Sequence, residues 1–146
     1  MGQSLTNKVK TIVGLAPVAA GTSTQSFYVD TAGYDGVRFI VSFGTITSGA
    51  VTSVKLASAD DASGTNPVDL LGTSVTVADT ADDKAVIIDM YRPATRFIGA
   101  VISRATQNSV INLGLVELYN TKKMPVTKDA SISGQEVHVS EPAGTA

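Results

Sequence analysis

The sequence predicts an all-β protein, a β-sandwich of about eight strands in the jelly-roll arrangement, with extended arms at the N- and C-termini. Three observations predict this fold class. Short runs of apolar residues alternate with polar residues at the two-residue period of strands. Glycine and aspartate separate these runs at the short intervals typical of sandwiches and barrels. Charged helix formers are scarce and scattered, so no segment has the pattern of an amphipathic helix.

The first clear strand lies at residues 36–44, where alternate positions place apolar side chains on one face. The residues of this face are Val37, Phe39, Val41 and Phe43. Gly36 and Gly44 are expected to bound the strand. The aromatic and β-branched residues 26–30 form the strand before it, and the Asp- and Gly-containing residues 30–36 form the connection.

Further runs with strand character follow along the chain. They are residues 51–58, 74–78, 85–91, 95–103 and 110–119. Pro93 ends the run at 85–91, because proline lacks the N–H group that a strand ladder uses. About eight strands fit between Lys8 and Tyr119, a number that favours the jelly roll, although periodicity does not by itself choose a topology. The chain therefore divides into three parts. They are an N-terminal arm with a possible first strand (residues 1–24), a sandwich body (25–120) and a C-terminal arm (121–146).

The composition limits the classes of function. A chain of 146 residues with 43% hydrophobic residues is long enough to bury one core. The net charge of −2 leaves no basic excess to neutralise phosphates, so direct nucleic-acid binding is not expected. The absence of cysteine excludes disulfides and thiolate chemistry. Gly14 and Pro17 interrupt the one stretch that imitates a signal peptide, and no apolar run approaches the roughly 18 residues that cross a bilayer. We therefore expect a protein that is made in the cytoplasm and has no membrane partner.

The C-terminal arm differs from the body because it has few large apolar residues and contains Pro125 and Pro142. Two interpretations stay open: a frayed terminus, or an arm that becomes ordered on a neighbouring subunit. Val137 and Val139 alternate with His138, which is the pattern of a short strand that pairs with an exposed sheet edge.

Arginines surround the run at residues 95–103. If strand alternation holds, Arg96 and Arg104 share one face with Ile98 and Ile102, and arginine is enriched in protein interfaces. This face is a candidate interface, and the alternative is a strand that is buried on both faces. The full set of candidate interface residues is Arg92, Arg96, Ile98, Ile102, Arg104, Lys122, Lys123, Val137 and Val139.

Two aspartate clusters, at residues 60–61 and 79–83, are the densest groups of carboxylates. Their spacing lacks the pattern of a calcium-binding loop, and aspartate commonly caps the backbone in turns, so solvated turns are favoured over a metal site. His138 is the only histidine, and it lies in the predicted arm, which does not offer the rigid frame that a catalytic histidine needs. No nucleophile elbow or phosphate-binding loop occurs. We therefore expect no catalytic residue, no cofactor and no metal, and the protein is not expected to be an enzyme.

Several stretches resemble a family of small proteins encoded in the head modules of tailed phages. The similar stretches are residues 27–39, 69–73, 89–93, 104–108 and 140–146, in that order. The resemblance implies a capsid decoration, or cement, protein with a jelly-roll body. Such a protein lies on the outer surface of the virion, and its partners are the major capsid protein and other copies of itself, as a dimer or trimer. The family has no active-site residues to carry over.

The leading expectation is a virion structural protein that binds the outside of a phage capsid and cements neighbouring major capsid protein subunits against internal pressure. The alternative is a carbohydrate-binding or host-attachment β-sandwich module of a phage head or tail fibre. That alternative favours solvent-facing aromatic residues, yet the aromatic fraction is 5% and there is no tryptophan. An enzyme on a cupin-like barrel would gather several histidines around a metal, and this chain has one.

Overall fold

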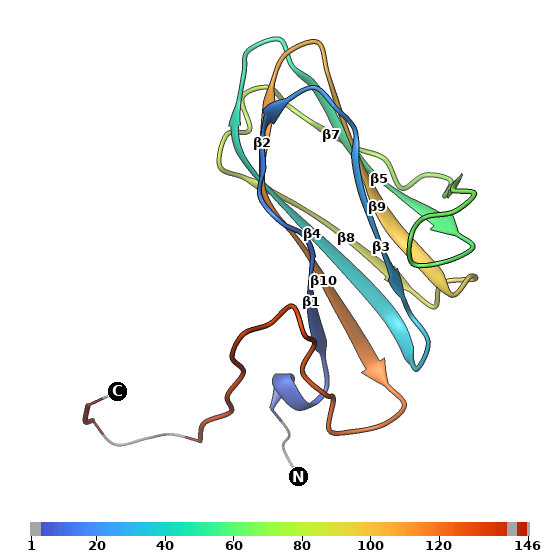
Figure 1. Cartoon of the computed structure of the whole chain (residues 1–146), viewed down its shortest axis with the longest axis vertical. Coiled ribbons are helices and arrows are strands. Elements are labelled where there is room, and N and C mark those ends of the chain that lie inside the picture. The colour runs from blue at the N-terminus through green and yellow to red at the C-terminus, as the bar shows by residue number, and fades with distance from the viewer. Residues whose placement is uncertain (1–3, 140–142, 146) are drawn as a thin grey trace.

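The computed structural model describes residues 4–139 and 143–145. It consists of two antiparallel sheets, each of five strands, that pack face to face (Figure 1). The first sheet contains β1 (Lys10–Leu15), β2 (Val18–Gly21), β4 (Tyr34–Ile46), β8 (Ala85–Tyr91) and β10 (Ser109–Thr121). The second contains β3 (Gln25–Asp30), β5 (Val51–Ala59), β6 (Val68–Asp69), β7 (Val75–Val77) and β9 (Phe97–Ala105). The predicted all-β sandwich is confirmed.

The strand order in the first sheet is β1-β10-β4-β8, and β2 pairs with the same strand, β10, as β1 does. In the second sheet the order is β3-β9-β5-β6, and β7 also pairs with β5. The connections β1–β2, β5–β6 and β6–β7 stay within one sheet. Every other connection along the chain crosses from one sheet to the other. Apart from β6 and β7, which pair with β5, neighbouring strands within a sheet therefore come from distant parts of the sequence.

The core lies between the two sheets and follows the alternation of the strands. Val37, Phe39, Val41 and Phe43 of β4 are fully buried, as the sequence pattern predicts. They pack against buried side chains of the facing sheet, and the rings of Phe27 and Phe39 contact each other with centroids 5.8 Å apart. The other large members of the core are Val54, Leu56, Ile98, Ile102, Ile111, Val116 and Leu118.

The expected strand boundaries at Gly36 and Gly44 are wrong. Strand β4 runs through both glycines, from Tyr34 to Ile46. At each glycine a side chain of β10 occupies the space above the backbone: a Cβ at Gly36 would lie 2.0 Å from the Tyr119 ring, and one at Gly44 would lie 2.8 Å from Asn112 Oδ1. These glycines permit close cross-strand packing inside the strand rather than ending it.

The two predicted arms are arranged differently from each other. Within the predicted N-terminal arm, residues 10–21 form β1 and β2, which pair with β10 and so belong to the sandwich. The 3-10 helix η1 (Leu5–Asn7) precedes them. The C-terminal segment leaves the end of β10 and extends beyond the body (Figure 1). Residues 1–3, 140–142 and 146 of the predicted arms lie outside the described residues. Across the residues that are described, no helix is long and apolar enough to cross a membrane.

Candidate functional site

Three chain segments meet at one end of the sandwich. They are the β3–β4 connection (residues 31–33), the β8–β9 connection (92–96) and the segment that follows β10 (122–128). Strand register brings them together, because Tyr34 at the start of β4 pairs with Thr121 at the end of β10. Backbone hydrogen bonds fix the contact: Lys122 N donates to Gly33 O at 2.9 Å, and Arg92 N donates to Asp35 O at 2.6 Å.

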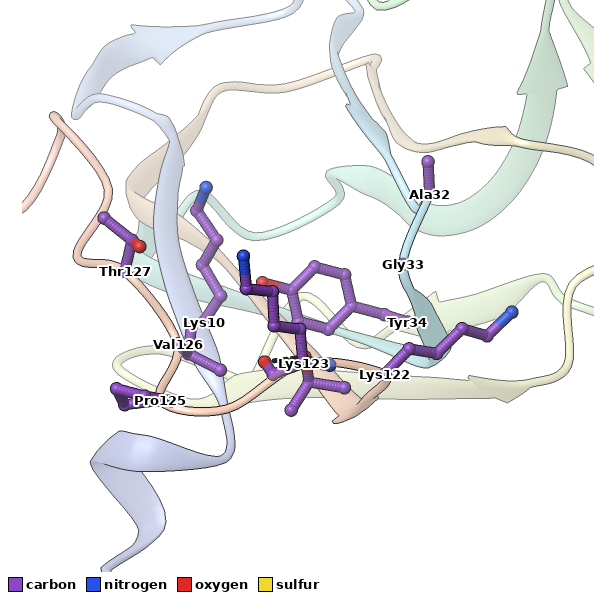
Figure 2. A pocket seen from close by; sticks show the side chains of 10 residues that line it. Lys10, Ala32, Gly33, Tyr34, Lys122, Lys123, Pro125, Val126 and Thr127 are labelled. Atoms are coloured by element: carbon purple, nitrogen blue, oxygen red, sulfur yellow. Dashed lines mark hydrogen bonds between the residues drawn. The ribbon is translucent and has the colours of Figure 1, made fainter.

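Two open grooves mark this end. A groove of about 570 Å³ is lined by side chains that include Arg92, Arg96 and Lys122. An adjoining groove of about 330 Å³ is lined by side chains that include Lys10, Lys122 and Lys123. Tyr34 lines both grooves. Figure 2 shows the amino groups of Lys10 and Lys123 pointing to the same side of the Tyr34 ring, while Lys122 points away from them. We call this surface the basic end, defined by Lys10, Arg92, Arg96, Lys122 and Lys123.

Carboxylates compensate only part of the positive charge of the basic end. Arg96 forms a two-pronged contact with Asp30, with its Nε and Nη2 at 2.8 Å and 2.7 Å from the two carboxylate oxygens. These hydrogen bonds from Arg96 lower the pKa of Asp30 below its usual value. Lys122 is 3.9 Å from Asp35, which is a weak ion pair in water.

Arg92 has a different partner, an aromatic ring. Its guanidinium lies 5.1 Å from the centroid of the exposed Tyr91 ring, in a cation–π contact. The backbone of Arg92 has φ of 53°, a left-handed conformation that non-glycine residues rarely adopt. The positive side chains of the basic end thus outnumber the carboxylates that pair with them. Such a surface suits a partner that presents negative charge.

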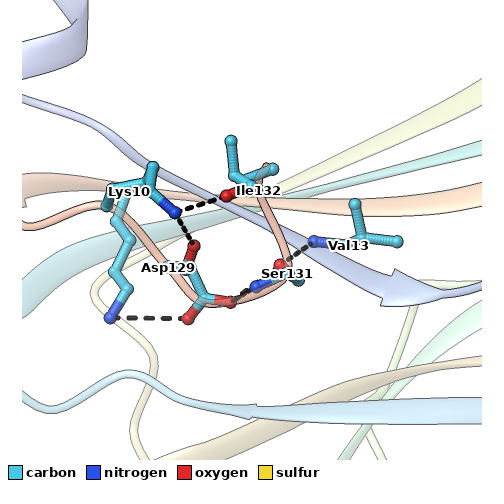
Figure 3. Close-up of polar contacts among 6 residues, drawn as sticks. Lys10, Val13, Asp129, Ser131 and Ile132 are labelled. Atoms are coloured by element: carbon cyan, nitrogen blue, oxygen red, sulfur yellow. Dashed lines mark hydrogen bonds and ion pairs between the residues drawn. The ribbon is translucent and has the colours of Figure 1, made fainter. Parts of the chain in front are cut away.

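The first half of the C-terminal segment is docked on the body. Val126 is buried, and its N–H donates to Asn7 O at 3.0 Å. Asp129 lies 3.6 Å from Lys10 Nζ and accepts hydrogen bonds from the N–H and hydroxyl of Ser131. The Ser131 hydroxyl in turn accepts the N–H of Val13 at 2.9 Å (Figure 3). The segment thus covers the outer edge of β1.

Beyond Ile132 the described part of the segment is exposed. Val137 and Val139 are 48% and 83% exposed, and residues 133–139 form no strand with the body. His138 Nε2 lies 2.9 Å from Glu136 Oε2 in an exposed pair. The short strand predicted around Val137 and Val139 does not form among the described residues of this segment.

The structure corrects one part of the predicted interface. Ile98 and Ile102 are buried in the core between the sheets, so they do not form a surface for a partner. The alternation along β9 is as predicted, since Ile98, Ile102 and Arg104 share a face, but that face points inward. Ile98 and Ile102 belong to the core cluster with buried residues of β4 and β10 in the facing sheet, whereas on the opposite face of β9 the Tyr28 ring lies over Gly99.

Arg104 is also buried, and it has a structural role. Its Nε donates to Ser23 O at 2.8 Å, and its Nη1 donates to Ala19 O at 3.0 Å and Ser109 O at 2.6 Å. Burial lowers the pKa of Arg104 from its usual value. The guanidinium thus joins the β2–β3 connection to β10 by satisfying buried carbonyl groups, and it is not available to a partner.

The remaining predicted residues fall into two groups. Arg92, Arg96, Lys122 and Lys123 are brought together at the basic end, whereas Val137 and Val139 lie in the exposed segment. Sequence reasoning missed Lys10 and Tyr34, which line the same grooves. Only the pairing of β1 and β4 with the end of β10 brings these two residues to the surface, and nothing in their local sequence signals it.

The aspartate clusters form backbone caps. Asp82 Oδ1 accepts the N–H of Ile46 at 2.7 Å, and Asp79 Oδ2 accepts the N–H of Gly49 at 2.7 Å. Asp61 accepts the N–H groups of Ser63 and Thr65 within its own turn. These bonds are the turn role that the sequence predicts. Within residues 4–139 and 143–145, no group of three or more His, Cys, Asp or Glu side chains is arranged to hold a metal ion.

No family model matches this chain, and no curated protein matches it.

Proposed function

We propose that this chain is a virion structural protein that binds the outside of a phage capsid and cements neighbouring major capsid protein subunits. Its proposed partners are the major capsid protein and further copies of itself. The proposal starts from the resemblance of the sequence to phage head decoration proteins. The role is mechanical and requires no catalytic step: a stiff body and its extensions hold neighbouring capsid subunits together.

The strand order supports the jelly-roll form of the body. If β1 and β2 count as one strand and β6 and β7 as another, the chain has eight strands. In that numbering the sheet orders are 1-8-3-6 and 2-7-4-5, and the chain crosses between sheets at almost every connection. This order is the one that two interlocked Greek keys produce. Such a body has a single core enclosed between two sheets and resists deformation. A protein that holds neighbouring capsid subunits together requires this stiffness.

The observation that carries the proposal is that the basic end and the docked C-terminal segment share one region of the surface. Lys122 and Lys123 line the grooves, and the same segment then continues past Ile132 to exposed Val137 and Val139. A charged surface and an extension that carries two exposed valines supply two separate contacts to one lattice. Because each contact raises the effective concentration of the next, modest individual affinities are sufficient.

Co-sedimentation with purified capsids of the phage that encodes the chain tests the proposal. The wild type is expected to pellet with capsids to a fixed stoichiometry. Lys122→Glu with Lys123→Glu should weaken binding about tenfold or more, because charge reversal opposes an acidic partner surface. The control, Lys55→Glu, reverses a charge on β5, away from both the basic end and β8, and should stay within about twofold.

The outcomes separate the parts of the proposal. A wild type that does not pellet with capsids contradicts the cement role, and binding to a glycan array in its place would support host attachment. Capsid binding that Lys55→Glu weakens as strongly as the double variant does shows a general effect of charge, and it contradicts the assignment of the basic end as the capsid-facing surface.

A further inference from the structure

We propose that the free edge of β8 is the surface through which two copies of this chain associate, with β8 of one copy pairing antiparallel to β8 of the second copy about Ile87. This inference rests on the proposed self-association and names its surface.

The backbone of β8 presents an unpaired row of donors and acceptors. Lys84 O accepts from Phe43 N, and Arg92 N donates to Asp35 O, so the even-numbered residues of β8 face β4. The odd-numbered residues Ala85, Ile87 and Asp89 therefore direct their N–H and C=O groups away from the sheet. Among the described residues β8 pairs only with β4. An unpaired row of this kind is a template for another strand.

Other edges of the sandwich are less suited to pairing. The edge of β1 is covered by the C-terminal segment, through the bond from Val13 N to Ser131 Oγ. Strands β6 and β7 are only 2 and 3 residues long. The edge of β3 is open, but its outward-facing residues include polar Ser26 and Asp30, and Asp30 is bound to Arg96. Strand β8 alone combines seven residues of edge with exposed apolar side chains: Ile87 and Tyr91 are 54% and 56% exposed.

An apolar row on the outer face of the first sheet ends at this edge. Register places Val13 beside Leu115, Leu115 beside Ile40, and Ile40 beside Ile87. The neighbours of these residues along each strand pack into the core, so the row itself faces outward. Val13, Leu115 and Ile40 are half-buried, and Ile87 is the exposed end of the row. If Ile87 pairs with Ile87 of the second copy, the row continues without a break across both copies.

Charge favours the antiparallel direction. Strand β8 begins after the acidic turn that contains Asp79, Asp82 and Asp83, and it is followed directly by Arg92 of the basic end. Antiparallel pairing about Ile87 places Arg92 opposite Asp82 of the second copy and, by symmetry, repeats the contact at the other end. Asp89 then lies opposite Ala85, so no like charges face each other. A parallel pairing would instead place acidic turn beside acidic turn.

Size-exclusion chromatography with light scattering over a concentration series tests the inference. The wild type should have twice the 15.0 kDa of one chain, and Ile87→Lys should raise the dissociation constant of the dimer about tenfold or more, because an edge lysine opposes strand pairing. Val68→Lys is the matched control: Val68 is 62% exposed on β6, and the same substitution there should leave the dimer unchanged.

A charge exchange provides a second, independent variant. Arg92→Glu should weaken the dimer, and adding Asp82→Arg in the same chain should restore it, because the pairing places these two residues opposite each other only between copies. Circular dichroism on each variant checks that the sandwich is folded. A monomeric or trimeric wild type, or an Ile87→Lys dimer as tight as the wild type, would overturn the inference.

Capsid co-sedimentation keeps the two proposals distinguishable. A wild type that is monomeric and still binds capsids refutes the β8 pairing and leaves the cement role intact. The same holds if β8 of that monomer contacts the capsid protein. A dimer that does not bind capsids supports the pairing and refutes the cement role.

Discussion

The ring of Tyr119 lies directly over Gly36, its partner across the β10–β4 ladder, so closely that a Cβ at position 36 would be 2.0 Å from the ring Cζ. The same side chain reaches one strand further, where its hydroxyl donates to Asp89 Oδ1 on β8 at 2.5 Å. One aromatic residue therefore joins three strands of the first sheet next to the basic end. The contact exists only because residue 36 has no side chain.

Gly36→Ala should lower the free energy of unfolding by about 1–2 kcal/mol, because the Tyr119 ring must move and its bond to Asp89 is lost. Urea denaturation measures the change. Gly134→Ala is the control, since nothing lies within 4 Å of a Cβ there, and its effect should stay within about 0.5 kcal/mol. Equal stability of the two variants would contradict the close packing at Gly36.

The same tyrosine predicts a loss of stability at high pH. Burial, and next the hydrogen bond to Asp89, raise the pKa of Tyr119 from 10.0 to about 12. Because the folded chain holds the phenolic proton more tightly than the unfolded chain, this contribution is complete below pH 10 and is lost as the pH rises towards 12. Tyr119→Phe should show a shallower decline of stability over this range than the wild type. Parallel pH profiles for the two proteins would contradict the assignment.

Arg104→Met should destabilise the fold by at least about 2 kcal/mol, because the carbonyl groups of Ala19, Ser23 and Ser109 lose a buried donor. Arg96→Met makes the same chemical change just before β9, where the side chain is exposed, and should cost less than about 1 kcal/mol. Thermal unfolding of both variants gives the comparison. If the two substitutions have the same effect, Arg104 does not hold the β2–β3 connection to β10.

Two deletions should separate the docked and exposed parts of the C-terminal segment. Removal of residues 133–146 takes away a stretch whose described residues are exposed, with Gln135 beside Thr11 and Glu117, and should leave the unfolding free energy within about 0.5 kcal/mol. Removal of residues 121–146 also uncovers the surface that buries Val126 and breaks the bond to Asn7, and should cost about 2 kcal/mol or more. Hydrogen exchange at Val13 should rise only in the longer deletion.

The strands could be predicted because alternation is a local property. The face formed by Val37, Phe39, Val41 and Phe43 follows from the sequence, and the run at 85–91 coincides with β8 (Ala85–Tyr91). Residues 10–21 fall within the predicted N-terminal arm, for which the sequence predicts only a possible first strand. Only pairing with β10 shows that they belong to the sandwich.

Alternation identifies which residues share a face, but it does not identify which face is buried. Arginines at both ends of β9 suggested a surface around Ile98 and Ile102, and that was wrong. The acceptors that allow Arg104 to be buried come from Ala19, Ser23 and Ser109, which are distant in sequence. The basic end was only partly predictable for the same reason: Lys10 joins Lys123 through strand register, which no local pattern records.

The most direct measurement of the central claim compares the heat resistance of virions that contain the protein with virions that lack it. DNA release on heating should occur at a lower temperature without the protein, and adding back the purified wild type should restore the higher temperature. Identical release curves for the two kinds of virion would contradict the claim that this chain cements the capsid.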